Sequence, residues 1–172
     1  AGTGHSAFCE LNYTPEAEDG SIQTTKAFKI AEMFEVSKQF WAYLVKKGLL
    51  QDPSSFITQT PHLSFVWDEN VEYLRKRFEL LAKSPLFEGM EYSENREQLE
   101  EWMPLIMEDR DPNQRVAATR MESGTDMNFG ALTRALFAHL ATYPDVKIHL
   151  HHEVDFIERR KADGHWELEA RA

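Results

Sequence analysis

The sequence is poor in several features that would assign it to a specialised class of protein. It has one cysteine, Cys9, so no disulfide can form within the chain and a disulfide-stabilised scaffold is excluded. Such sparse cysteine fits a reducing compartment, and Cys9 is interpreted as a small buried residue rather than a nucleophile. No apolar run approaches the roughly 20 residues that cross a bilayer, so the pattern predicts no membrane-spanning helix.

Clustered positive charge is also scarce. The chain carries 29 acidic against 19 basic residues, for a net charge of -10, and no basic run exceeds three residues. Because nucleic-acid binding needs concentrated lysine and arginine, nucleic acid is not expected as a partner. The same acidity disfavours broad electrostatic binding to anionic lipid.

What the chain has is material for a core: 42% of its 172 residues are hydrophobic and 12% are aromatic. This composition excludes disorder of the whole chain and suits one domain. Predicted strands mix with helices without regular βαβ alternation, which favours the α+β class over a doubly wound sheet.

Helical periodicity is clearest over residues 24–47, where aromatic and aliphatic residues recur three and four apart and Gly48 is a plausible C-cap. Core packing explains these aromatic residues better than a quinone or membrane surface does. The remaining pattern predicts a helix capped by Asp68 or Asn70 and ended by Ser84 and Pro85. Two further helices are predicted over residues 93–102 and 128–140. Strands are predicted over residues 62–67, 116–122 and 146–150, and a hairpin over 153–170.

The opening stretch AGTGHS is typical of a loop that contacts a phosphate or a cofactor. Gly2 and Gly4 allow close backbone approach, and Thr3, His5 and Ser6 add short hydrogen-bonding groups. The stretch matches neither G-x-G-x-x-G nor the P-loop pattern, so a flexible tail is the alternative interpretation.

Two further residues are candidates for chemistry. His62 begins an apolar strand directly after Pro61, where a half-buried imidazole could act as a general base or could simply bond to the backbone. Arg120 lies in a strand of small apolar residues, where its guanidinium could bind an anion or form an internal ion pair.

Other polar residues have simpler explanations. His149, His151 and His152 suggest a metal site, but no carboxylate completes the set, and a solvated strand face is favoured. Asp126 and Asn128 precede a predicted helix, so capping accounts for at least one of them.

Six stretches together resemble the malate:quinone oxidoreductase family of FAD-dependent enzymes, and the resemblance runs from end to end. They are AGTGHSAFCELNYTP, KQFWAYLVKKG, PHLSFVW, SPLFEGMEYS, MPLIMEDRDP and AATRMESGTDMNFGALTR. The resemblance implies that Gly2, Thr3, Gly4, His5 and Ser6 lie close to the flavin. It also implies that residues 1–22 form a flavin-proximal loop and connection, and residues 23–172 part of a substrate domain, a mostly antiparallel sheet with flanking helices.

This chain departs from the family pattern in three features. It lacks G-x-G-x-x-G, the ribose-binding acid and the segment that closes over the flavin. We therefore expect the chain to be an internal piece of a longer protein and not to retain FAD by itself. The resemblance implies a parent enzyme at the inner face of the cytoplasmic membrane. That parent would oxidise (S)-malate to oxaloacetate, with hydride passing to the flavin and electrons to a quinone.

Residue type and context suggest roles in that reaction, which needs a base for the hydroxyl proton and donors for two carboxylates. His62 is the candidate base, Arg120 the carboxylate clamp, and Thr119 and Asn128 are candidate nearby donors. The alternatives are a separate binding domain that docks through its aromatic helix, and a related flavin-dependent 2-hydroxyacid dehydrogenase with another acceptor.

We predict that the isolated 172-residue chain folds at least partly but does not oxidise malate, because the dinucleotide-binding part of the site is not in this sequence. The assay is malate-dependent dye reduction, with a visible spectrum to detect bound flavin. Measurable malate-dependent reduction by the chain alone would contradict this prediction.

Overall fold

Two antiparallel sheets organise residues 1–134, the larger of the two units into which the chain divides. The computed structural model describes residues 2–3 and 6–172, and side chains from Ser6 onward. The smaller unit, residues 135–172, is described separately below.

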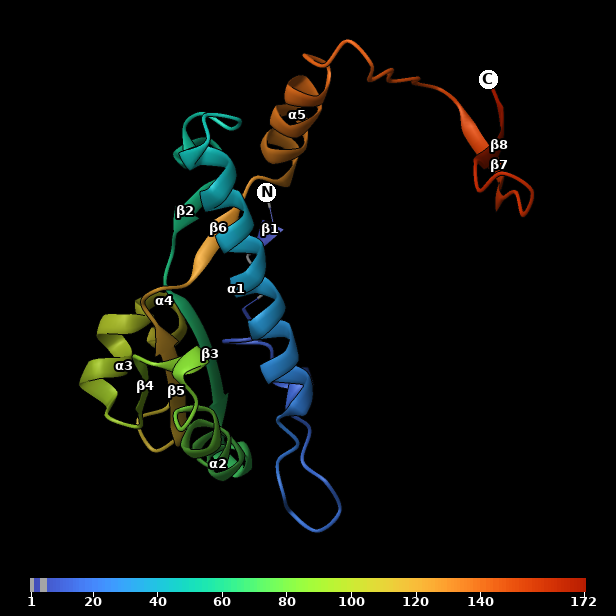
Figure 1. Ribbon diagram of the computed structural model, residues 1–172. Helices are drawn as coiled ribbons and strands as arrows, with labels where there is room; N and C mark the ends of the chain where they lie inside the picture. Colours follow the sequence, from blue (N-terminus) through green and yellow to red (C-terminus); the bar gives the residue numbers. More distant parts are fainter. Residues whose placement is uncertain (1, 4–5) are drawn as a thin grey trace. The chain divides into compact units, whose positions relative to one another are not determined.

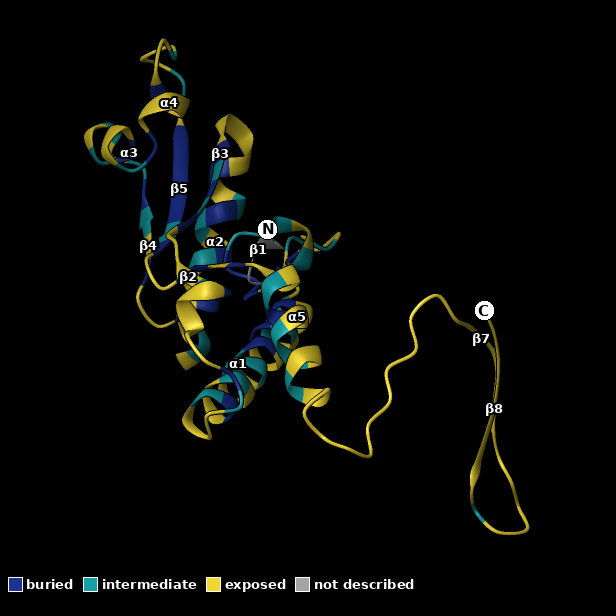
Figure 2. Ribbon diagram, turned by 90° about the horizontal axis from the view of Figure 1, so that it is seen from above, coloured by how far each residue is buried: buried dark blue, intermediate teal, exposed yellow. Residues whose placement is uncertain are grey.

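The first sheet has the order β3-β5-β4, formed by β3 (His62–Trp67), β5 (Val116–Met121) and β4 (Met90–Ser93). β5 is the central strand, and it is buried over almost its whole length (Figure 2). Because both of its faces are covered, β5 is a nearly continuous run of apolar and small residues rather than an alternating pattern.

Helices cover the two faces of this sheet (Figure 1). Helix α2 (Val71–Leu81) packs against Val66 and Ala117 on one face. The other face is covered by α3 (Arg96–Trp102) and α4 (Pro104–Met107), through a cluster of Leu99, Met103, Met107, Val116 and Ala118. Because successive side chains of β5 point to opposite faces, Ala117 lies in the α2 cluster, whereas Val116 and Ala118 lie in the cluster of α3 and α4.

The second sheet, of order β1-β6-β2, continues the same two chain segments. It contains β1 (Gly2–Thr3), β6 (Thr125–Met127) and β2 (Ile57–Gln59), and β2 runs into β3 as β5 runs into β6. At the bend between the sheets, the Thr60 amide donates to the Gly124 carbonyl at 2.8 Å. A Cβ on Gly124 would lie 2.4 Å from the Thr60 carbonyl oxygen and 2.5 Å from the His62 ring, so only glycine fits there.

The long helix α1 (Thr25–Lys46) joins a core cluster that it shares with the N-terminal segment. Its Ala27 and Ala31 are fully or almost fully buried, and Phe28 meets the Phe87 ring edge-on at 5.8 Å. Phe8 meets the same ring from another side at 5.7 Å. Phe34 of α1 is also buried, but Phe40 and Tyr43 are exposed, at 53% and 54%, so only part of the helix's aromatic content is core within this chain.

Helix α5 (Phe129–Leu140) begins in the first unit, where the Asn128 side chain accepts a hydrogen bond from the Ala131 amide at 3.0 Å. The second unit contains the antiparallel hairpin of β7 (Glu153–Arg159) and β8 (Trp166–Arg171), which turns through Gly164 at a φ of 72°. Every residue of both strands is exposed (Figure 2).

The α+β class and the antiparallel sheet are confirmed, as are the main helices and strands 62–67 and 116–121. The strand expected over residues 146–150 is wrong, because this segment pairs with no strand in the described part of the chain. Pro104 does not only end a helix: it occupies the first turn of α4, where its missing N–H is not needed. The short strands β2, β4 and β6 were not predicted.

Candidate functional site

His62 lies at the start of β3 and its side chain is buried, at 8% exposure. Its Nε2 is 3.0 Å from the Thr125 carbonyl oxygen, and because a carbonyl only accepts, Nε2 carries the proton in this contact. In the neutral ring Nδ1 is then an acceptor, and it has no hydrogen-bond partner within the described residues. The histidine therefore has both a backbone anchor and an atom that can take a proton.

Strand register decides which candidate residues share a face with His62. His62 pairs with Met121 and Ser64 pairs with Thr119, so these four residues lie on the face covered by α2. The Thr119 hydroxyl is buried and lies 2.9 Å from the Ser64 hydroxyl. Thr119 is thus near His62 on the sheet, but its hydroxyl already has a partner.

Arg120 projects from the opposite face, because neighbouring residues of a strand alternate. It pairs with Glu122 at 2.5 Å, and its guanidinium lies 5.8 Å from the centre of the Trp102 ring. The internal ion pair considered from the sequence is therefore present. The structure does not bring Arg120 and His62 to one site.

Asn128 connects strand β6 to helix α5. Its side chain caps the helix, as the sequence suggested, and its amide N–H donates to the Phe56 carbonyl at 2.8 Å. The neighbouring Asp126 lies within β6 and accepts a hydrogen bond from the Met127 amide. Both residues have structural roles at the end of the second sheet.

The described part of the AGTGHS stretch is a strand rather than a loose tail. Gly2 pairs with Met127 and Thr3 with Asp126, while Gly4 and His5 lie outside the described residues and Ser6 is buried. β1 is an edge strand of the described sheet, so its second backbone edge suits a bound group that accepts or donates hydrogen bonds.

Strand β6 links β1 to the candidate base, His62. It pairs with β1 on one side, and its Thr125 carbonyl holds the His62 ring. The sequence alone did not connect these features, because Gly2 and Thr3 pair with residues 126–127 and His62 bonds to Thr125, contacts between segments more than sixty positions apart.

Sequence reasoning missed Arg77, the largest fully buried side chain among the described residues. It lies three residues after Leu74 and four before Leu81, so a charged residue in the buried stripe of α2 was the available signal. Burial lowers the pKa of its guanidinium, and the nearby charged groups oppose that effect.

Cys9 lies in the segment that Arg77 contacts. Burial, and next the charge of Glu10, raise the pKa of its thiol to about 12, against a smaller opposing effect of Arg77. The thiol therefore stays protonated at neutral pH, which supports its interpretation as an unreactive residue.

Three histidines of the second unit, His149, His151 and His152, directly precede strand β7. Among residues 2–3 and 6–172 there is no group of three metal-ligating side chains, and His149, His151 and His152 are exposed. The rings of His149 and His152 meet edge-on, with centres 5.4 Å apart.

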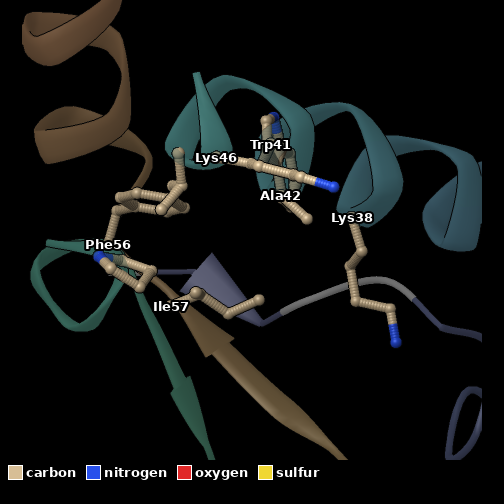
Figure 3. Close-up of a pocket in the computed structure, with 8 residues that line it drawn as sticks. Lys38, Trp41, Ala42, Lys46, Phe56 and Ile57 are labelled. Atoms are coloured by element: carbon tan, nitrogen blue, oxygen red, sulfur yellow. The ribbon is translucent and has the colours of Figure 1, made fainter. Parts of the chain in front are cut away.

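An apolar cavity of about 350 Å³ lies between α1 and the start of β2 (Figure 3). Its lining consists of Lys38, Trp41, Ala42, Val45, Lys46, Pro53, Phe56 and Ile57. The rings of Trp41 and Phe56 meet edge-on at 6.3 Å. It contains none of the candidate catalytic residues, so it is not the acid–base site.

The fold is an α+β arrangement in which strand β6 supports both the short edge strand β1 and the buried His62. The chain matches the family model "Malate:quinone oxidoreductase (Mqo)" over residues 1–172, and it belongs to that family.

Close relatives agree with this assignment. The chain is 58% identical over 167 residues to a probable malate:quinone oxidoreductase of Flavobacterium psychrophilum, with 96% of this chain and 34% of the relative covered. It is 59% identical over 172 residues to one of a Geobacillus species, with 99% and 33% covered. The chain thus spans about a third of the length of these relatives.

We predict that Gly124→Ala destabilises the full-length protein by about 1–3 kcal/mol, because the new methyl group must displace the Thr60 backbone or the His62 ring. Thermal unfolding of the full-length protein measures the effect. Gly130→Ala is the matched control, since its Cβ would meet no backbone atom: its near neighbours are the flexible end of Arg134 at 3.3 Å and the Asn128 side-chain oxygen at 3.5 Å, the latter an ordinary contact. Equal unfolding midpoints for Gly124→Ala and the wild type would contradict the prediction.

Proposed function

We propose that the full-length protein oxidises (S)-malate to oxaloacetate and passes the electrons to a quinone. The observation that carries this proposal is the family match over residues 1–172, together with relatives of 58–59% identity that bear that name. We further propose that FAD is the cofactor, that residues 1–22 form the flavin-proximal connection, and that residues 23–172 belong to a substrate domain.

When bound, FAD would supply the acceptor for the hydride that leaves malate C2. The residues of this chain that would hold it are Gly2, Thr3, Gly4, His5 and Ser6. The support for this assignment is the edge position of β1 and its pairing with β6. Among the described residues no helix has the length and apolarity to span a bilayer, and we propose that the parent reaches the quinone as a peripheral membrane protein.

The proposed base is His62, acting through Nδ1. The Thr125 carbonyl holds the Nε2 proton, which fixes the neutral tautomer that has its lone pair on Nδ1. When Nδ1 takes the hydroxyl proton the ring becomes positively charged, and the same carbonyl dipole stabilises that charge. Nδ1 is enclosed by protein in this chain, so malate must displace neighbouring side chains to reach it.

Arg120 is proposed as a carboxylate clamp in a site on the other face of the sheet. A single malate cannot contact both Arg120 and His62 across the sheet, so the two assignments are alternatives that need separate tests. Thr119 and Asn128 are proposed as neutral donors to the substrate. The Thr119 hydroxyl now lies 2.9 Å from the Ser64 hydroxyl, and Asn128 accepts the Ala131 amide through Oδ1, so Asn128 would donate to the substrate through its Nδ2.

In the full-length enzyme we expect His62→Gln to lower kcat by roughly 10²- to 10⁴-fold, the usual range for loss of a general base, while KM for malate changes less. The acidic limb of the pH profile of kcat/KM should disappear, because glutamine does not titrate between pH 5 and 8. Turnover is measured per bound flavin, with malate and with 2-hydroxyglutarate as substrates.

Normalisation to flavin separates this role from a structural one. A histidine that only anchors β3 predicts lower stability or lost flavin with near-normal turnover of the molecules that retain it. Turnover within about threefold of the wild type would remove His62 from the mechanism.

For Arg120→Lys in the same enzyme we expect a marked rise in KM for malate, because a lysine point charge cannot reproduce the two parallel hydrogen bonds of a guanidinium with a carboxylate. Steady-state kinetics measure the effect. Glu122→Gln is the control, since it removes the present ion-pair partner without changing Arg120. Unchanged kinetics for Arg120→Lys would leave Arg120 as a structural ion pair.

A further inference from the structure

Arg77 is buried at 0% exposure in the middle of α2, and its hydrogen bonds all lead to one distant segment. Its Nε donates to the Thr14 hydroxyl at 2.9 Å, and its Nη2 donates to the carbonyls of Ala7 at 3.1 Å and Phe8 at 2.9 Å. Burying a guanidinium costs free energy, and the three hydrogen bonds offset part of that cost. Because they are directional, they fix the backbone of Ala7 and Phe8 and the side chain of Thr14 relative to α2, which apolar packing alone would not do.

The segment that Arg77 holds has little regular structure of its own. It follows β1, and Ala7 has a φ of 61°, in the left-handed region that alanine rarely adopts. Tyr73, one helical turn before Arg77, reinforces the attachment, because its hydroxyl lies 2.9 Å from the carbonyl oxygens of both Leu11 and Thr14. Two side chains of α2 therefore determine the path of residues 7–14.

This segment contacts the candidate base directly. The Phe8 ring meets the His62 ring edge-on, with centres 6.0 Å apart, and it also packs against Phe87. His62 is thus confined by Phe8 on one side, by the Thr125 carbonyl through Nε2, and by the close approach of Gly124. Of these three constraints, only the Phe8 contact depends on α2.

We propose that Arg77 is a positioning residue of the active site: by fixing the backbone of Ala7 and Phe8, it sets the position of the Phe8 ring against His62. This inference rests on the proposed role of His62 as the base. Arg77 does not touch the substrate in this scheme and acts only through the segment that it holds. A displacement of the imidazole by about 1 Å is enough to cost roughly 100-fold in rate, so a remote anchor can have a large kinetic effect.

The test uses the full-length flavoenzyme with Arg77→Met and Arg77→Lys, each alone and combined with His62→Gln. Arg75→Met is the matched control, because Arg75 lies on the same helix but is partly exposed and pairs with Glu94 near the surface. Phe8→Leu is the second probe: it keeps both backbone carbonyls that Arg77 contacts but removes the aromatic ring. The measurements are kcat per bound flavin, KM for malate and thermal midpoint.

We expect Arg77→Met and Arg77→Lys to lower kcat per bound flavin by roughly 10- to 100-fold with KM for malate changed by less than about threefold. Arg75→Met should retain wild-type turnover. In the His62→Gln background the Arg77 and Phe8 substitutions should cause no further loss, because the group that they position is already gone.

Four results would overturn the inference, and they differ in whether they also overturn the proposed base. Near-normal turnover per flavin in the Arg77 variants, or losses that add to that of His62→Gln, would overturn it and leave the proposed base intact. If the Arg77 variants retain no flavin, Phe8→Leu decides, and normal turnover in that variant would also overturn it. Normal turnover of His62→Gln would overturn both this inference and the proposed base.

Discussion

The register between the two long chain segments β2–β3 and β5–β6 is the constraint on which the rest of residues 1–134 depends. These segments pair in both sheets and bend together where Thr60 meets Gly124. A slip by one residue would move every side chain to the other face, because strand side chains alternate. In β5 such a slip would move Arg120 to the face covered by α2, and Ala117 would leave the cluster that it forms with α2.

Several of the buried polar side chains connect segments that are distant in sequence. The Ser64 and Thr119 hydroxyls join β3 to β5, the His62 ring joins β3 to β6, and Arg77 joins α2 to the N-terminal segment. Each such bond is worth more in a low-dielectric interior than at the surface, and each leaves a costly buried group if its partner is removed. These bonds therefore fix positions that apolar contacts alone would leave adjustable.

Polar groups nearer the surface contribute less to stability than these buried hydrogen bonds, as the network around Glu94 illustrates. Glu94 accepts hydrogen bonds from Arg75, Tyr92 and Arg115 in a partly exposed network. Burial by itself would raise the pKa of Glu94, but these donors outweigh it and lower the pKa to about 2. The stability contributed by this carboxylate is present above the ordinary titration range of glutamate and is lost only as the pH falls towards 2. Solvent screening keeps that contribution modest, since exposed ion pairs contribute little.

The sequence by itself determined the elements whose periodicity is long and local. The stripe of α1, the apolar run of β3 and the Asn128 cap of α5 depend on neighbouring residues, and each was predictable from them. The short strands β2, β4 and β6 were not, because three or four residues carry no usable period and exist as strands only through their partners.

Tertiary structure decided the candidate site. His62, Thr119 and Arg120 were recognisable as unusual residues in apolar strands, but only the register put Thr119 on the face of His62 and Arg120 on the other. Arg77 was hidden within an apparently ordinary helix, because its importance lies in contacts with residues 7, 8 and 14, more than sixty positions away. The local sequence pattern indicates which residues prefer burial. It does not determine which residues contact one another, because the free energy that favours particular contacts arises only when distant segments pack together.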